Sequence, residues 1–94
     1  MMRFFGESKL ETGQVAADTT AIRVVPARSN RRSLLIVQHG TNAVYIGKDK
    51  DVVSTTGVLL NGVAGTGIAI PTTGEVWAIA GATQTISFIE IYTE

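Results

Sequence analysis

The chain has 94 residues and a mass of 10.0 kDa, which allow a single domain. Its 8 basic and 8 acidic side chains balance, so it lacks the basic excess that nucleic-acid binding needs. It contains no cysteine, which excludes disulfides, a thiolate nucleophile and a cysteine-based zinc site. Hydrophobic residues are 45% of the chain and charged residues only 17%, so part of this apolar excess must stay exposed or be covered by a partner.

Residues 1–19 show no sustained period of 2 or 3.6, and we predict an N-terminal arm there, ahead of a β-sandwich domain at 20–94. The apolar stretch of this arm is too short for a signal peptide, and Glu7 and Lys9 interrupt it. No apolar run approaches the roughly 20 residues of a transmembrane helix. We therefore expect a soluble protein that carries no export signal and does not contact a membrane.

From Thr20 onward the chain consists of short segments rich in Val, Ile and Thr, separated by Gly, Asn, Asp or Pro. These segments predict strands at 20–25, 33–38, 43–47, 65–70, 75–80 and 84–92, with short pieces at 51–54 and 58–60. Gly40 and Asn42 tolerate positive φ, and the strands on either side of them are expected to form a β-hairpin. Because the connections are too short for crossover helices, we predict an all-β fold, an antiparallel β-sandwich or jelly-roll-like small domain, with a small barrel as the alternative.

Three expected strands are apolar on both faces, at 34–37, 76–79 and 86–92. A two-layer sandwich covers only the inner face of a strand, so the outer face needs a loop, the arm or another subunit. We expect a homo-oligomer; the alternative is a monomer whose loops fold over one face. The residues expected at the oligomer interface are Leu35, Val37, Tyr45, Trp77 and Ile79.

The residues that would carry enzymatic chemistry are sparse. His39 is the single histidine, it lies in an expected turn, and no G-x-S-x-G sequence accompanies it. Glu75 and Glu90 are expected to be solvent-facing strand residues. The Asp49-Lys50-Asp51 spacing lacks the other ligands of a calcium loop. We predict no enzymatic activity, no metal site and no cofactor, and a hydrolase that uses loop carboxylates stays a minor alternative.

Two positively charged segments are candidates for contact with a partner. Arg31 and Arg32 directly precede an expected apolar strand, where they contact a partner or, as the alternative, protect the strand from aggregation. The arm contributes Arg3, Phe4 and Phe5 as a possible anchor.

Several segments together resemble small virion proteins of tailed bacteriophages, among them head decoration (cement) proteins and head- or tail-associated β modules. The resemblance covers roughly residues 31–92 and lies in Arg32-Ser33-Leu34-Leu35-Ile36-Val37-Gln38, Gly40-Thr41-Asn42, Val44-Tyr45-Ile46-Gly47, Thr56-Gly57-Val58-Leu59-Leu60 and Glu75-Val76-Trp77-Ala78-Ile79-Ala80-Gly81. His39 departs from the Leu or Ser expected beside the turn glycine.

This resemblance implies a non-catalytic β-sandwich or jelly-roll subunit that decorates and stabilises a phage capsid as a homotrimer. Its partners would be copies of itself and the major capsid protein or another virion protein, and its location the virion, assembled in the host cytoplasm. The alternative is a carbohydrate- or receptor-binding module of a tail or fibre. In that case Tyr45, Trp77 or Tyr92 would stack on sugar rings, and Asn42 or Asn61 would bind hydroxyls.

Overall fold

The computed structural model describes residues 8–93 of the chain, and these form eight β-strands joined by turns and loops. The strands are β1 (Ser8–Ala17), β2 (Ile22–Val25), β3 (Arg31–Gln38), β4 (Val44–Gly47), β5 (Val58–Leu60), β6 (Gly67–Ala69), β7 (Val76–Ala80) and β8 (Gln84–Thr93). No helix long and apolar enough to cross a membrane occurs among the described residues.

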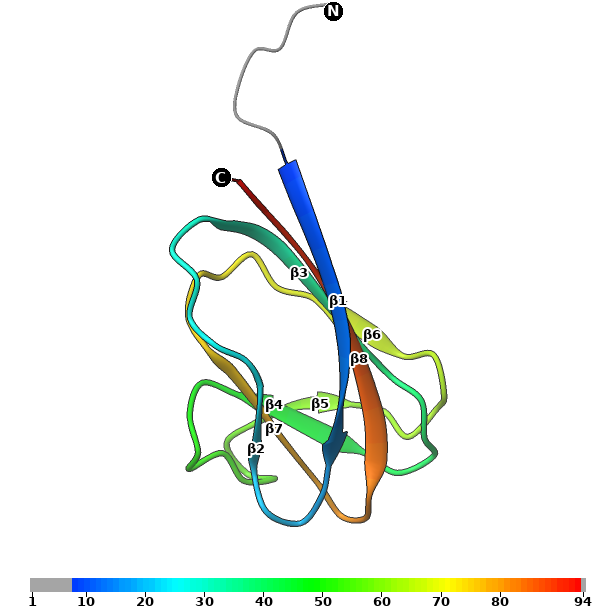
Figure 1. The fold of residues 1–94 in the computed structure, drawn as a ribbon. Helices are drawn as coiled ribbons and strands as arrows, with labels where there is room; N and C mark the ends of the chain where they lie inside the picture. The colour runs from blue at the N-terminus through cyan, green and yellow to red at the C-terminus, as the bar shows by residue number, and fades with distance from the viewer. Residues whose placement is uncertain (1–7, 94) are drawn as a thin grey trace, which may run out of the picture.

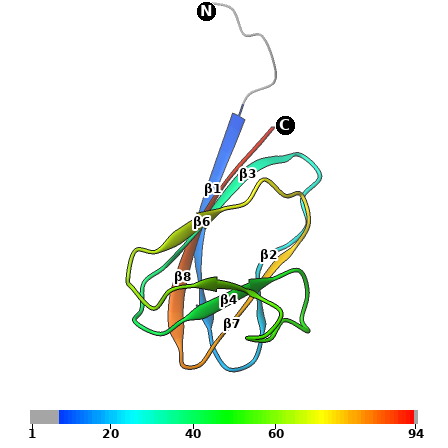
Figure 2. The ribbon, with the colours of Figure 1, turned by 180° about the vertical axis from the view of Figure 1, so that it is seen from behind.

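The strands form two four-stranded antiparallel sheets (Figures 1 and 2). The first, sheet A, has the order β1-β8-β3-β6, and the second, sheet B, has the order β2-β7-β4-β5. This strand order is that of an eight-stranded jelly roll, in which two four-stranded sheets pack face to face. The predicted all-β sandwich is therefore confirmed.

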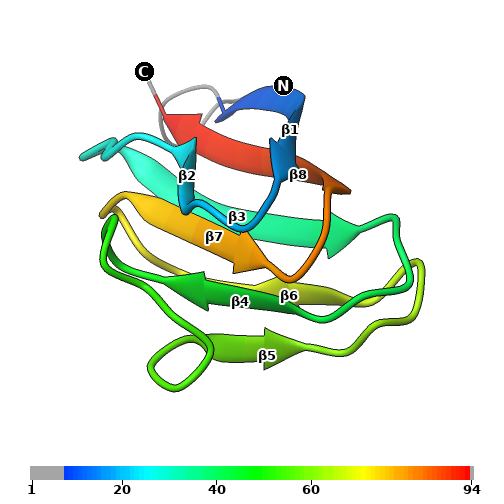
Figure 3. The same cartoon turned by 90° about the horizontal axis from the view of Figure 1, so that it is seen from below.

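Most connections between successive strands cross from one sheet to the other, as the view from below shows (Figure 3). In the described chain only β4 and β5 are neighbours both in sequence and in a sheet. The expected hairpin at 33–47 is thus wrong: β3 pairs with β8 and β6, whereas β4 pairs with β7 and β5. The turn through Gly40 reverses the chain between the two layers, and no residue in it has a positive φ.

The structure also corrects the arm predicted for residues 1–19. Ser8–Ala17 form a ten-residue strand at the edge of sheet A, paired along its whole length with β8 from Ser8↔Thr93 to Ala17↔Gln84. An edge strand buries only one side, so its sequence is more polar than that of the central strands. Arg3, Phe4 and Phe5 lie outside the described residues. The short strand expected at 51–54 is part of a loop.

The core lies between the inner faces of the two sheets. Sheet A contributes Leu34, Ile36 and Ile86, and sheet B contributes Val44 and Ala78, all at most 1% exposed. Buried and half-buried residues alternate along β4 and β7, as the period of 2 in a strand requires. The half-buried residues between them point to the outer face, so each sheet has a second face that the sandwich itself leaves uncovered.

Candidate functional site

The outer face of sheet A is built from alternate residues of all four of its strands. The register places Leu10 beside Ile91, and Thr12, Ile89, Leu35 and Ala69 in one row across the sheet. Leu35 is 39% exposed and Leu10 60% exposed. The other members of this face are Gln14, Ser33, Val37, Gly67, Ser87 and, at its edge, Ala16 and Thr85. None of these residues is ionisable.

A hollow of about 280 Å³ lies on this face. Its walls include Leu35 and Val37 from β3 and Thr12 and Gln14 from β1. Gly13 and its register partner Phe88 also line it, and the Phe88 ring fills the place of a side chain at residue 13: a Cβ on Gly13 would lie 2.7 Å from Phe88 Cζ. The face therefore has protruding leucines beside a depression.

The outer face of sheet B is different because it carries charges. Trp77 lies here, and its indole Nε1 donates a hydrogen bond of 2.9 Å to Glu75 Oε1. Glu75 in turn lies 3.8 Å from Arg23 Nη1. Tyr45 and Ile79 are register partners on the same face, next to a hollow of about 310 Å³.

A loop covers part of this second face. Val52, in the connection between β4 and β5, is only 5% exposed although it belongs to no strand. It packs onto Gly47, where a Cβ would come within 2.4 Å of Val52 Cγ2, and also close to Gly57. The cover expected for the outer faces is thus supplied in part on sheet B by the chain's own loop.

The five residues predicted for one oligomer interface consequently lie on two opposite faces. Leu35 and Val37 belong to sheet A, whereas Tyr45, Trp77 and Ile79 belong to sheet B. Sequence reasoning missed Leu10 and Ile89 as members of the first surface. Leu10 fell within the expected arm, because residues 1–19 have no sustained period of 2 to mark a strand.

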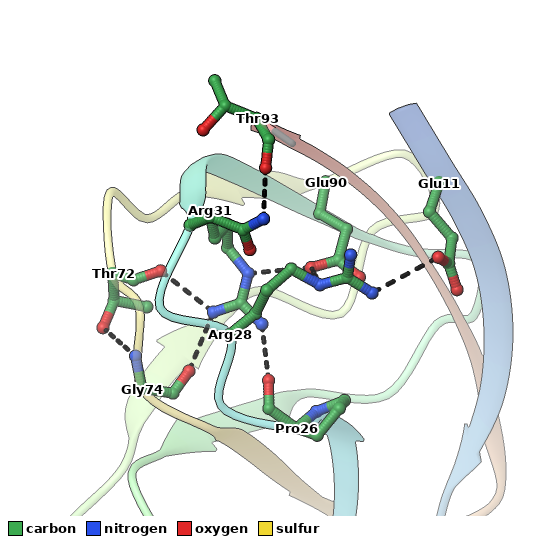
Figure 4. Close-up of polar contacts among 9 residues, drawn as sticks. Glu11, Pro26, Arg28, Arg31, Thr72, Gly74, Glu90 and Thr93 are labelled. Carbon is green, nitrogen blue, oxygen red and sulfur yellow. Dashed lines mark hydrogen bonds and ion pairs between the residues drawn. The ribbon is translucent and has the colours of Figure 1, made fainter. Parts of the chain in front are cut away.

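Arg31 is part of a buried ionic cluster at one end of the sandwich (Figure 4). Its Nε lies 2.8 Å from Glu90 Oε1, and its side chain is 0% and that of Glu90 2% exposed. The remaining donors bind the carbonyls of Thr72, Gly74 and Pro26 at 2.6–2.9 Å. Every one of these contacts lies inside the chain, so the partner contact predicted for Arg31 has no accessible group to make it. Arg32 is exposed, so its contact with a partner stays a prediction.

Arg28 extends this cluster toward β1. Its guanidinium lies 3.6 Å from Glu90, 3.4 Å from Glu11 and 3.9 Å from the centroid of the Tyr92 ring. Burial lowers the pKa of Arg28, but its contacts with Tyr92, Glu90 and Glu11 outweigh this and raise it, so Arg28 remains a cation. One face of the Tyr92 ring, which was considered for stacking on a sugar, is thus covered by Arg28.

The residues considered for catalysis have structural contacts. Glu90, expected to face solvent, is buried against Arg31. His39 Nε2 lies 2.8 Å from Ser87 Oγ, and within residues 8–93 no carboxylate lies within ion-pair distance of His39 to orient it. The part of the chain that the structure describes also has no group of three or more residues able to hold a metal ion. The geometry shows two outer sheet faces that carry exposed large apolar side chains, among them Leu10, Leu35 and Leu59.

Comparison with known proteins gives a structural similarity only. No protein-family model matches the chain, and no curated protein matches it. Among solved structures it is similar to a protein of the Bacillus endospore appendages, which form a novel family of disulfide-linked pili. The two share 15% sequence identity with a TM-score of 0.54, over 99% of this chain and 96% of the other. At this identity the similarity concerns the fold alone.

Proposed function

We propose that this protein is a structural, non-catalytic subunit that decorates and stabilises the capsid of a tailed bacteriophage as a homotrimer. The observation that carries the proposal is the presence of large apolar side chains on both outer faces of a two-layer sandwich. Leu35 is 39% and Leu10 60% exposed on one face, and Leu59 is 51% exposed on the other. Exposed apolar surface of this kind marks a site of contact between proteins.

The scaffold suits a structural subunit that stays bound at one place in an assembly. Arg31 joins both sheets at one end, since it binds Glu90 of β8 and the backbone beside β2 and β7. A decoration protein needs such a stiff body, a self-association surface and a surface that meets the shell. A trimer at a local threefold position repeats each shell contact three times, so every contact can be weak while the whole remains attached. The resemblance of residues 31–92 to small virion proteins supports this assignment.

The proposal is tested with purified protein and undecorated capsids of its own phage. We expect the protein to co-sediment with the capsids and to raise their melting temperature, because a bound trimer bridges neighbouring shell subunits. Failure to bind, combined with an unchanged capsid melting temperature, would overturn the proposal.

A second candidate is a subunit of a non-covalent fibre, favoured by the full-length similarity to the pilus protein. Two association surfaces that face in opposite directions give an open stack when one binds the other, because no rotation closes the ring. This chain has no cysteine, so its copies could not be linked by disulfides. Negative-stain electron microscopy of the purified protein distinguishes the two: filaments support this candidate, and discrete particles support the decoration protein.

A further inference from the structure

We infer that the outer face of sheet A packs against other copies of this chain, whereas the outer face of sheet B stays outside this contact. This deepens the proposed function, on which it rests, because it names the surface that holds the homo-oligomer together. The surface is defined by Leu10, Thr12, Gln14, Ser33, Leu35, Val37, Gly67, Ala69, Ser87, Ile89 and Ile91.

The first argument is charge. Charged residues are usually about a quarter of a soluble domain, yet none of the residues that define this face is charged. The exposed Arg32 lies beside Ser33 at one end of β3. The chain does have 16 charged residues, 8 basic and 8 acidic, and Arg23 and Glu75 lie on the outer face of sheet B. Depletion of charge is what distinguishes the centre of a protein–protein interface from other surface. A surface without charge also makes no electrostatic repulsion when it meets a copy of itself.

The second argument is the arrangement of polar and apolar groups. Leu35 and Ile89 are register partners in the two central strands, while Thr12 and Gln14 lie on the edge strand β1. An apolar centre with a polar rim is the usual composition of a stable interface. Ser87 is a polar group near the centre, and His39 already satisfies its hydroxyl at 2.8 Å. Burial of Ser87 therefore leaves no unpaired hydroxyl.

The third argument is shape and size. Leu35 is 39% exposed and helps to line a hollow of about 280 Å³, so an exposed apolar side chain lies beside a depression that could receive one from a second copy. Four strands spaced about 4.8 Å apart, with an average length of about eight residues, from 3 in β6 to 10 in β1 and β8, present about 500 Å² per copy. In a trimer each face meets two neighbours, so three such faces bury about 1,500 Å² in all, shared among three contacts.

A second copy of this chain is a better partner for this face than the capsid surface is. An uncharged apolar face is an aggregation hazard whenever it is free, so it is best covered from the time of folding. Permanent contacts between identical subunits are the more apolar class of interface. In a trimer, three such faces would surround the common axis and exclude water from it.

The test compares two Leu→Glu substitutions at exposed strand positions on opposite faces. Leu35→Glu places a charge in the centre of the inferred interface, and Leu59→Glu places one on the outer face of sheet B, where Leu59 is 51% exposed. Light scattering after size-exclusion chromatography gives the mass. We expect wild type and Leu59→Glu at about three times 10.0 kDa, and Leu35→Glu at 10.0 kDa.

Circular dichroism and urea unfolding confirm that each variant is folded. If Leu35→Glu does not fold, Leu10→Glu replaces it, since Leu10 is 60% exposed on the same face. The inference is overturned if wild type is a monomer, if Leu35→Glu keeps the oligomer, or if Leu59→Glu alone dissociates it. Capsid binding is measured separately. If Leu35→Glu dissociates the oligomer but the wild-type oligomer does not bind capsids, the proposed function is wrong and the inferred interface is still supported.

Discussion

Arg31 Nε and Glu90 Oε1 lie 2.8 Å apart inside the sandwich, although 59 residues separate them in the chain. Both side chains are excluded from water, and Arg31 also binds three backbone carbonyls from two different connections. The pair therefore fixes the start of β3 to β8 and to the segments that enter and leave sheet B. Such a contact holds the two sheets together at one end of the sandwich.

Replacing Arg31 by Met is expected to destabilise the fold by about 3–5 kcal/mol, the usual cost of removing one partner of a buried ion pair. Glu90 then keeps only Arg28, at 3.6 Å, as a charged partner, and the carbonyls of Thr72, Gly74 and Pro26 lose their donor. Urea unfolding followed by circular dichroism measures the change. Arg32→Met is the matched control and should stay within about 0.5 kcal/mol of wild type, because Arg32 is exposed. Equal effects of the two substitutions would contradict the role given to Arg31.

Arg31 and Arg32 also differ in a way that the sequence alone could not predict. Two adjacent arginines before an apolar strand are chemically equivalent in the sequence. One is buried because a register shift lies between Arg31 and Ser33 and because Glu90 comes from the last strand. Neither the bulge nor the distant carboxylate has a local signal. The strands from β2 onward were predictable, since alternation and the breaks at Pro26 and Pro71 are local properties, whereas β1 was assigned to an arm.

The pairing of those strands was less predictable than their positions. A glycine-containing turn reverses the chain both in a hairpin and in a jelly-roll connection between layers, so Gly40 does not distinguish the two. Leu35 and Trp77 both lie on strands with two apolar faces. Because the sequence does not show which sheet each strand joins, the two residues were assigned to one interface. Only the order of strands in each sheet shows that their outer faces point in opposite directions.

Val52→Ala is expected to destabilise the protein by about 2 kcal/mol, because two buried methyl groups are lost and the loop leaves a cavity above Gly47. The neighbouring residue provides the control: Val53 is 44% exposed, so Val53→Ala should change stability by less than about 0.5 kcal/mol. Thermal unfolding of both variants is the measurement. A result in which both substitutions are neutral would show that the loop does not pack on sheet B in solution.

Gly62→Ala is expected to destabilise the connection between β5 and β6, because its new Cβ would meet the Thr41 carbonyl oxygen at 2.4 Å. Backbone cannot move aside as a flexible side chain does, so a cost of about 1–3 kcal/mol follows from overpacking. Gly81→Ala is the control, since no atom lies within 4 Å of its Cβ position and its φ is not positive. That variant should be unchanged or more stable by about 0.4–1 kcal/mol, through the lower entropy of its unfolded chain. Unfolding midpoints in urea compare the two, and a neutral Gly62→Ala would mean that the two connections are not in contact.

Trp77 is the chain's one tryptophan and lies on the face opposite Leu35, so it reports on sheet B alone. If sheet A holds the oligomer together, the indole has the same surroundings in the oligomer and in the Leu35→Glu monomer, including its hydrogen bond to Glu75. We therefore expect acrylamide to quench Trp77 fluorescence with the same efficiency in both, since quenching follows solvent access to a side chain that the interface does not cover. Trp77→Phe gives the background signal. A clearly higher quenching efficiency in the monomer would place Trp77 within the self-association surface and assign the two faces the other way round.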